Sequence, residues 1–351
     1  MEFLRREHKR FNKGEYRDFI LGGDIGATNC NLGIFGLKGT FPKLLVSFHF
    51  KSKKLKNLHG PINLVLDYAG KEKRILISKC CLGIAGVLSY KKDYVKLTNA
   101  NLQISLNELY KKTSLLKIIL MNDFEAVGYG ISMIPRKDIK TIKKGTKIVN
   151  APIVVIGAGT GLGKTIMYYA EKKKIYIPMP SEIHHADFPA QDKAEMKLAE
   201  FIKSYRKIKN VSNGDILSGD GLENIYLFLR KAGKFKKTKI IAQIDKSKNK
   251  PELISKYRKE EPICRKTFEI FKMAYAGFAK NCALDALSFN GVYIAGGIAP
   301  KNADIFDSGF IKEFEKSNKM NQILKKIPIY LVLNYDAGLL GAGFAGAMML
   351  K

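Results

Sequence analysis

Tryptophan is absent from this 351-residue sequence, and cysteine and histidine each occur only five times. The cysteines are odd in number and contain no CxxC spacing, which argues against a disulfide framework and against a zinc site. Long apolar runs are also missing, since no stretch approaches the roughly 18 residues that a membrane-spanning helix requires. We therefore expect reduced, buried thiols in a cytoplasmic protein with no membrane partner.

Acidic residues are few, because 32 Asp and Glu stand against 61 Lys and Arg, a net charge of +29. Such a balance fits an anionic partner such as nucleic acid. Only 10 of the 61 basic residues are arginine, however, and the lysines are spread along the chain, whereas nucleic-acid readers combine arginine with aromatic stacking on one face. We interpret the charge as a solvated lysine-rich surface and expect no nucleic-acid partner. Residues 1–16 are basic without an apolar segment, which predicts a solvated extension.

Short apolar runs alternate with helical patterns, which is typical of an α/β protein. Residues 19–21 and 30–35 predict two strands around a turn of small residues, and residues 153–156 and 165–170 predict two strands around a second turn. The turns lie 133 residues apart (159 minus 26), which hints at two related halves. Further strands are expected at 44–50, 75–87, 118–121, 175–177, 292–295 and 329–333, helices at 62–69, 106–112, 125–134, 192–205, 264–287 and 338–350, and a loop at 136–152.

The second turn contains Gly157, Gly159, Thr160, Gly161 and Gly163. Its glycine spacing does not match the GxGxxG of dinucleotide-binding proteins. Residues 158–165 come close to a P-loop, GxxxxGK[ST], but a P-loop opens a helix, and the β-branched and aromatic residues 165–169 favour a strand. A phosphate-binding turn between two strands is a third interpretation, since glycine lets backbone N–H groups approach phosphate oxygens. A glycine-rich hairpin without a ligand also remains open.

The first turn combines small residues, a hydroxyl group and a carboxylate. Its members are Gly23, Asp24, Ile25, Gly26, Ala27, Thr28 and Asn29. Asp24 is of the type that holds Mg²⁺ through water, and the hydroxyl and the turn amides suit phosphate. Two such turns, if opposed, would form a clamp for a nucleoside triphosphate.

Further motifs follow these turns in a fixed order. They are Leu97-Thr98-Asn99 and residues 121–124, 180–188, 217–226, 295–300 and 338–343. The ordered set, over roughly residues 18–346, resembles the bacterial-type glucokinase family within the actin-like ATPase superfamily of sugar kinases. The resemblance implies a two-domain α/β fold (ribonuclease H-like) with a cleft between the domains. We expect a small domain of residues 17–121 plus 335–351 and a large domain of residues 122–334.

The resemblance also implies ATP-dependent phosphorylation of a hexose, most simply glucose, with Mg²⁺, by a cytoplasmic homodimer. Asp123 follows an apolar strand, and a carboxylate near a substrate hydroxyl can act as a base. The resemblance assigns Asp123 this role on the sugar 6-hydroxyl. It further implies sugar contacts from Asn122, Asp123, Glu182 and His185, and a nucleotide contact from Gly296 and Gly297. Without the resemblance, Asn122 and Asp123 would be explained as a helix N-cap.

The sequence departs from the family pattern near the sugar. The family glutamate that precedes the Leu-Ser-Gly motif falls on Gly214, and Asp215, one residue later and one methylene shorter, is the candidate replacement. Ile183 and His184 stand where the family usually has glycine. These departures leave the identity of the hexose open. They also keep open the alternative of a sugar-sensing or catalytically weak homologue. The net charge of +29 and residues 158–165 keep open a second alternative, a P-loop ATPase associated with nucleic acid.

Overall fold

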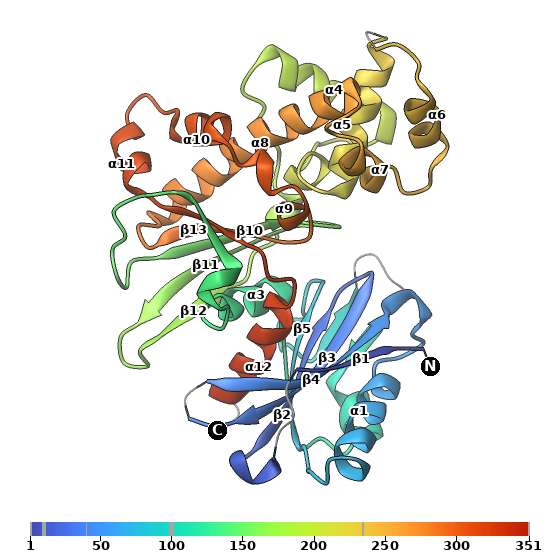
Figure 1. Cartoon of the computed structure of the whole chain (residues 1–351), viewed down its shortest axis with the longest axis vertical. Coiled ribbons are helices and arrows are strands. Elements are labelled where there is room, and N and C mark those ends of the chain that lie inside the picture. The colour runs from blue at the N-terminus through green and yellow to red at the C-terminus, as the bar shows by residue number, and fades with distance from the viewer. Residues whose placement is uncertain (1, 9–11, 40, 98–101, 234, 350–351) are drawn as a thin grey trace. The chain divides into compact units, whose positions relative to one another are not determined.

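The computed structural model describes residues 2–8, 12–39, 41–97, 102–233 and 235–349. The chain divides into two compact α/β units (Figure 1). Unit 1 comprises Met1–Arg136, Ala170–Pro180 and Asn334–Lys351, and unit 2 comprises Lys137–Tyr169 and Ser181–Leu333. Unit 1 therefore extends beyond the boundary expected at residue 121. Within the described ranges, no helix is long and apolar enough to span a membrane.

Unit 1 is built on a six-stranded sheet with the order β1-β4-β3-β2-β5-β8. The neighbours β2, β5 and β8 run parallel, whereas β1, β3 and β4 pair antiparallel. The strands are β1 (Leu4–Glu7), β2 (Phe19–Ile25), β3 (Asn29–Leu37), β4 (Pro42–Lys51), β5 (Lys79–Ile84) and β8 (Lys117–Asn122), with a separate ribbon of β6 (Tyr94–Lys96) and β7 (Gln103–Ser105). The helices are α1 (His59–Lys71), α2 (Leu106–Lys112), α3 (Asp123–Ile131) and α12 (Ala337–Met349), with short 3-10 turns at Lys13–Glu15 and Ser52–Lys54.

Two helices of unit 1, α3 and α12, cross at glycines. A Cβ added to Gly341 would overlap the carbonyl oxygen of Ala126, and one added to Gly130 would overlap that of Ala337. The two backbones approach this closely only because neither position has a side chain. This contact groups α3 with unit 1, which is why the unit boundary lies beyond residue 121.

The N-terminal segment differs from the expected solvated extension. Residues 4–7 form β1, which pairs antiparallel with the edge of β4. Arg5 forms an ion pair with Glu72 at 3.3 Å, and the hydroxyl of Tyr68 donates to Glu7 at 2.9 Å. The side chains of β1 are exposed, so sequence hydrophobicity did not reveal this edge strand.

The second six-stranded sheet has the order β12-β11-β10-β13-β14-β9. Its strands are β9 (Ile139–Lys143), β10 (Ile153–Ala158), β11 (Leu162–Ala170), β12 (Ile175–Met179), β13 (Gly291–Ala295) and β14 (Ile329–Val332). The helices of unit 2 are α4 (Lys193–Arg206), α5 (Gly219–Lys231), α6 (Lys239–Lys246), α7 (Lys250–Lys256), α8 (Pro262–Ala286), α9 (Ile298–Lys301), α10 (Ser308–Glu315) and α11 (Asn321–Lys326). Short 3-10 turns lie at Arg136–Asp138, Ile183–His185, Asn213–Asp215 and Ala303–Ile305.

Several elements differ from expectation. The loop expected at residues 136–152 contains β9, whose Lys143 ammonium is buried and donates to the carbonyl groups of Leu324 and Ile327 at 3.0 and 2.9 Å. The strand expected at 75–87 is limited to β5, and α3 begins at Asp123, two residues earlier than expected. The helices α6 and α7 were not anticipated.

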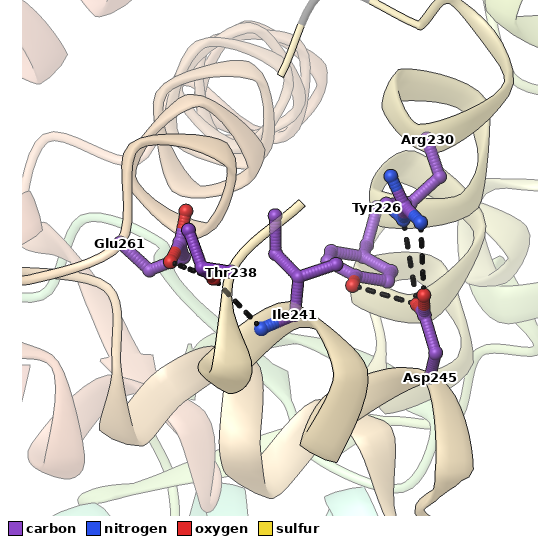
Figure 2. Close-up of polar contacts among 6 residues, drawn as sticks. All are labelled: Tyr226, Arg230, Thr238, Ile241, Asp245 and Glu261. Carbon is purple, nitrogen blue, oxygen red and sulfur yellow. Dashed lines mark hydrogen bonds and ion pairs between the residues drawn. The ribbon is translucent and has the colours of Figure 1, made fainter. Parts of the chain in front are cut away.

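Polar contacts hold α6 in place, as Figure 2 shows. The buried Tyr226 of α5 donates its hydroxyl to Asp245 of α6 at 2.8 Å, and Arg230 donates to the same carboxylate at 2.9 Å. At the other end of α6, its N-cap Thr238 donates to Glu261 at 2.8 Å, just before α8 begins. These contacts join α6 to the neighbouring helices of unit 2.

Candidate active site

The polar residues expected in unit 1 lie at one edge of its sheet. Asp24 lies near the end of β2, and Asn122 ends β8, with β5 between these two parallel strands. Gly83 of β5 pairs with Asp24, and a Cβ added to Gly83 would lie 3.6 Å from the Cα of Asp123. Because parallel strands present their carboxyl ends at a common edge, the structure brings Asp24, Asn122 and Asp123 together there.

The first turn is a hairpin between β2 and β3. The N–H of Gly26 donates to the carbonyl of Asn29 at 2.9 Å, which closes the turn. Thr28 and Asn29 are exposed, and the Asn29 side chain accepts from Lys51 at 2.9 Å. The turn therefore presents a hydroxyl group to solvent, as a phosphate-binding turn requires.

Asp24 is half-buried beside the start of α12. The amide of Asn31 donates to its carboxylate at 3.5 Å, and a Cβ added to Gly338 would lie 2.9 Å from its Cγ. Burial raises the pKa of Asp24 to about 6, the Asn31 hydrogen bond opposes this, and the charge of Asp336 adds to it. Within the described ranges, no group of three or more His, Cys, Asp or Glu side chains could hold a metal. A lone carboxylate suits a hydrated divalent cation that takes its other ligands from phosphate and water.

The N-terminus of α3 fixes Asn122 and Asp123. The side-chain oxygen of Asn122 accepts from the N–H of Phe124 at 2.9 Å, and Glu125 accepts from the N–H of Asn122 at 2.9 Å. This reciprocal capping box confirms the N-cap interpretation of Asn122. The cap also places Asp123 as the first residue of α3.

Of the family motifs, Thr98 and Asn99 lie outside the described residues.

The glycine-rich segment 157–163, here called the phosphate loop, connects two antiparallel strands. Gly157 pairs with Gly163, and Leu162 begins β11. A P-loop would open a helix, and its lysine would be available to phosphate. Here the equivalent Lys164 lies within a strand and donates to Asp285 of α8 at 2.6 Å. The P-loop alternative is therefore wrong.

The adjacent residues Gly296 and Gly297 lie against the phosphate loop. Gly296 has a φ of +85°, and a Cβ there would approach the carbonyl oxygen of Ala158 to 2.6 Å. A Cβ added to Gly159 would lie 3.6 Å from the backbone nitrogen of Gly297. The structure thus brings together the two segments of unit 2 that were expected to bind nucleotide. Their small residues leave backbone groups accessible to a flat or anionic ligand.

Residues 181–188, here called the sugar loop, are held by the segment around Asn213. Its side-chain amide donates to the carbonyl of Ala186 at 3.0 Å. Glu182 and His185 are exposed, so their side chains are accessible to a small molecule. Asp215, the predicted replacement for the family glutamate, also has a structural role, because its Oδ2 accepts from both the N–H and the hydroxyl of Ser212, at 2.8 and 2.7 Å. It caps the 3-10 turn Asn213–Asp215.

His184 is a site residue that sequence reasoning did not select. Its Nδ1 accepts from the N–H of Leu162 at 3.1 Å, so it links the sugar loop to the phosphate loop. A Cβ added to Gly214 would overlap three atoms of the His184 ring. Burial, and then the neighbouring His185, lower the pKa of His184. The sequence marked His184 and Gly214 as separate departures, but only the fold shows that they are in contact.

Solved structures of other proteins share the fold of this chain. A glucokinase from an Antarctic psychrotroph superposes with a TM-score of 0.75 at 24% identity, covering 94% of this chain and 98% of that one. A glucokinase from Balamuthia mandrillaris, solved in complex with glucose, gives a TM-score of 0.75 at 20% identity, covering 94% and 93%. The fold is therefore the actin-like fold of two α/β domains found in sugar kinases.

Sequence comparison defines the family. The model of the family described as Glucokinase matches residues 21–349. A glucokinase from Nostoc punctiforme is 32% identical over 344 residues, and one from Trichormus variabilis is 34% identical over 345. Each alignment covers 94% of this chain and 99% of the relative. The chain belongs to the glucokinase family.

Proposed function

We propose that this protein transfers the γ-phosphoryl group of ATP to the 6-hydroxyl of glucose. Membership of the glucokinase family over residues 21–349 supports the reaction. The observation that carries the proposal is the polar edge of the unit 1 sheet, where only the strand β5 lies between the strand of Asp24 and the strand that leads to Asp123. A base for the sugar hydroxyl and a carboxylate for the cation of ATP are among the groups that phosphoryl transfer needs.

Asp123 acts as the base in this mechanism. The sugar 6-oxygen forms a bond to the γ-phosphorus while the bond from that phosphorus to the bridging oxygen of ADP breaks. The hydroxyl proton passes to the Asp123 carboxylate. The capping box at Asn122 holds the start of α3, so the base is positioned before the substrate arrives.

The other residues that the sequence motifs indicated bind the sugar and the nucleotide. Asn122, Glu182 and His185 bind sugar hydroxyl groups, since amide, carboxylate and imidazole offer both donors and acceptors. The nucleotide contacts come from the first turn, the phosphate loop and the pair Gly296 and Gly297. Asp24 would hold Mg²⁺ through water, and the ion would neutralise phosphate charge when bound. We further propose that the protein is cytoplasmic and that it forms a homodimer. Light scattering of the purified protein would test the homodimer.

A panel of hexoses with ATP and Mg²⁺, assayed by coupled ADP release, tests the reaction. We expect turnover with glucose, and a loss of about 10²–10⁴-fold in kcat in Asp123→Asn. Asp67→Asn, which changes an exposed carboxylate on α1, is the matched control and should retain full activity. Absence of turnover on every hexose would refute the kinase proposal. Glucose binding without turnover would instead favour the sugar-sensing alternative.

A further inference from the structure

The His184 side chain lies where three segments of unit 2 meet. It extends from the short 3-10 turn Ile183–His185 of the sugar loop. Its Nδ1 accepts from the N–H of Leu162, the first residue after the tip of the phosphate loop. The same nitrogen lies 3.3 Å from the position that a Cβ on Gly161 would take. The imidazole therefore packs directly against the phosphate loop.

Gly214 makes room for this ring. Its backbone does not require glycine, because it is absent from the glycines with positive φ. A Cβ at this position would nevertheless overlap Nδ1, Cε1 and Nε2 of His184. The backbone cannot easily retreat, since the carbonyl of Gly214 accepts from the buried Ser218 hydroxyl at 2.7 Å. Space for the imidazole is therefore the reason for glycine at this position.

We propose that His184 is a positioning residue that joins the sugar loop to the phosphate loop, and that Gly214 is its obligatory partner. The inference rests on the proposed function, because those two loops are assigned to the two substrates. A side chain anchored in both loops fixes the distance between a sugar ligand such as His185 and the turn that receives phosphate. Displacing the ring should affect the binding of sugar and of nucleotide together.

The hydrogen bond to Leu162 also sets the form of the imidazole. Nδ1 accepts an N–H only through its lone pair, so the ring is neutral and the proton is on Nε2. The lowered pKa of His184 agrees with a neutral ring at neutral pH. Asparagine offers a side-chain oxygen near the place of Nδ1, whereas leucine has similar bulk and no acceptor. The pair His184→Asn and His184→Leu therefore separates the hydrogen bond from the packing.

A double-mutant cycle on His184→Ala, Gly214→Ala and the combined variant tests the contact. Each single change should raise the KM for glucose and the KM for ATP by roughly tenfold. A tenfold change corresponds to about 1.4 kcal/mol, which lies within the range of coupling energies between residues in contact. The combined variant should be no worse than either single variant, because the new methyl group then occupies vacated space. Gly277→Ala, a glycine of α8 with open space at its Cβ position, is the matched control and should leave both values unchanged.

Hydrogen exchange at the Leu162 amide provides a readout that is independent of activity. We expect fast exchange in His184→Leu and wild-type protection in His184→Asn, with recovered KM values in the latter. Independent, additive effects of the two alanine substitutions would overturn the proposal, as would unchanged Leu162 protection in His184→Leu. If the wild type has no kinase activity, the proposed function fails. The exchange measurement still decides whether His184 holds the phosphate loop.

Discussion

Replacing Asp24 with asparagine separates the contribution of this carboxylate to catalysis from its effect on stability. The substitution preserves shape, and an asparagine oxygen can still accept from the amide of Asn31. The native pKa of Asp24 is about 6, above the usual 3.8, with burial as the main cause. At about 1.36 kcal/mol per pKa unit, this shift corresponds to at most about 3 kcal/mol. Because Asp24 is half-buried, we expect a gain of about 1–3 kcal/mol in the variant at neutral pH.

The stability difference between Asp24→Asn and the wild type should increase with pH. A raised native pKa means that the folded protein binds the proton more tightly than the unfolded chain does. The stabilising effect of protonation is therefore complete below about pH 4 and is lost as the pH rises to about 6. Asp24→Asn should consequently unfold at higher urea concentration than the wild type at pH 7.5, with a smaller difference at pH 4.5. The same variant should lose most of its kinase activity.

Urea unfolding without added nucleotide or Mg²⁺, followed by circular dichroism at both pH values, measures the effect. Asp67→Asn serves as the control, since this exposed carboxylate lies on α1 of the same unit. Equal stability of Asp24→Asn and wild type at pH 7.5 would contradict the burial argument. A larger gain at pH 4.5 than at pH 7.5 would contradict its sign.

Substitutions at three further positions test packing and hydrogen bonding, two in unit 1 and one in unit 2. Gly338→Ala places a methyl group 2.9 Å from the Cγ of Asp24 and should lower kcat by roughly tenfold with little change in melting temperature. The reason is that a small displacement of a catalytic group reduces the rate steeply. A wild-type kcat in this variant would contradict the prediction. Gly341→Ala, on the same helix, overlaps the α3 backbone and should destabilise the protein by about 1–3 kcal/mol in urea unfolding; unchanged stability would show that the two helices can separate at no cost. Asp245→Ala removes the acceptor of the buried Tyr226 hydroxyl and should cost about 1–3 kcal/mol, whereas Asp245→Asn should cost less; equal losses would indicate that the hydrogen bond is unimportant.

The local parts of the fold were readable in the sequence. The hairpins β2–β3 and β10–β11 follow from strand-forming runs around small residues, and the structure confirms both. The helix predicted at the C-terminus is confirmed as α12. The strand β9 and the helix α6 were missed, because both are short and carry lysines, and their polar contacts are with residues outside the element.

The sequence likewise indicated some features of the candidate site and not others. The order of motifs indicated Asp24, Asp123 and the phosphate loop, because each motif combines residue types that the chemistry itself requires. The capping role of Asp215 was not predicted, since the sequence alone does not show whether a carboxylate near a Leu-Ser-Gly motif caps a turn or binds a ligand. Only the contact with Ser212 shows that this carboxylate caps the turn Asn213–Asp215.

The sequence by itself determined the α/β class, the strand-turn-strand units and the family to which the chain belongs, because these depend on short-range patterns and on their order. Tertiary structure decided which residues meet. Asp24 lies beside Gly338 although 314 positions (338 minus 24) separate them, and His184 fills the space above Gly214. Such contacts depend on the close packing of whole elements, where the presence or absence of a single Cβ decides whether two segments can touch.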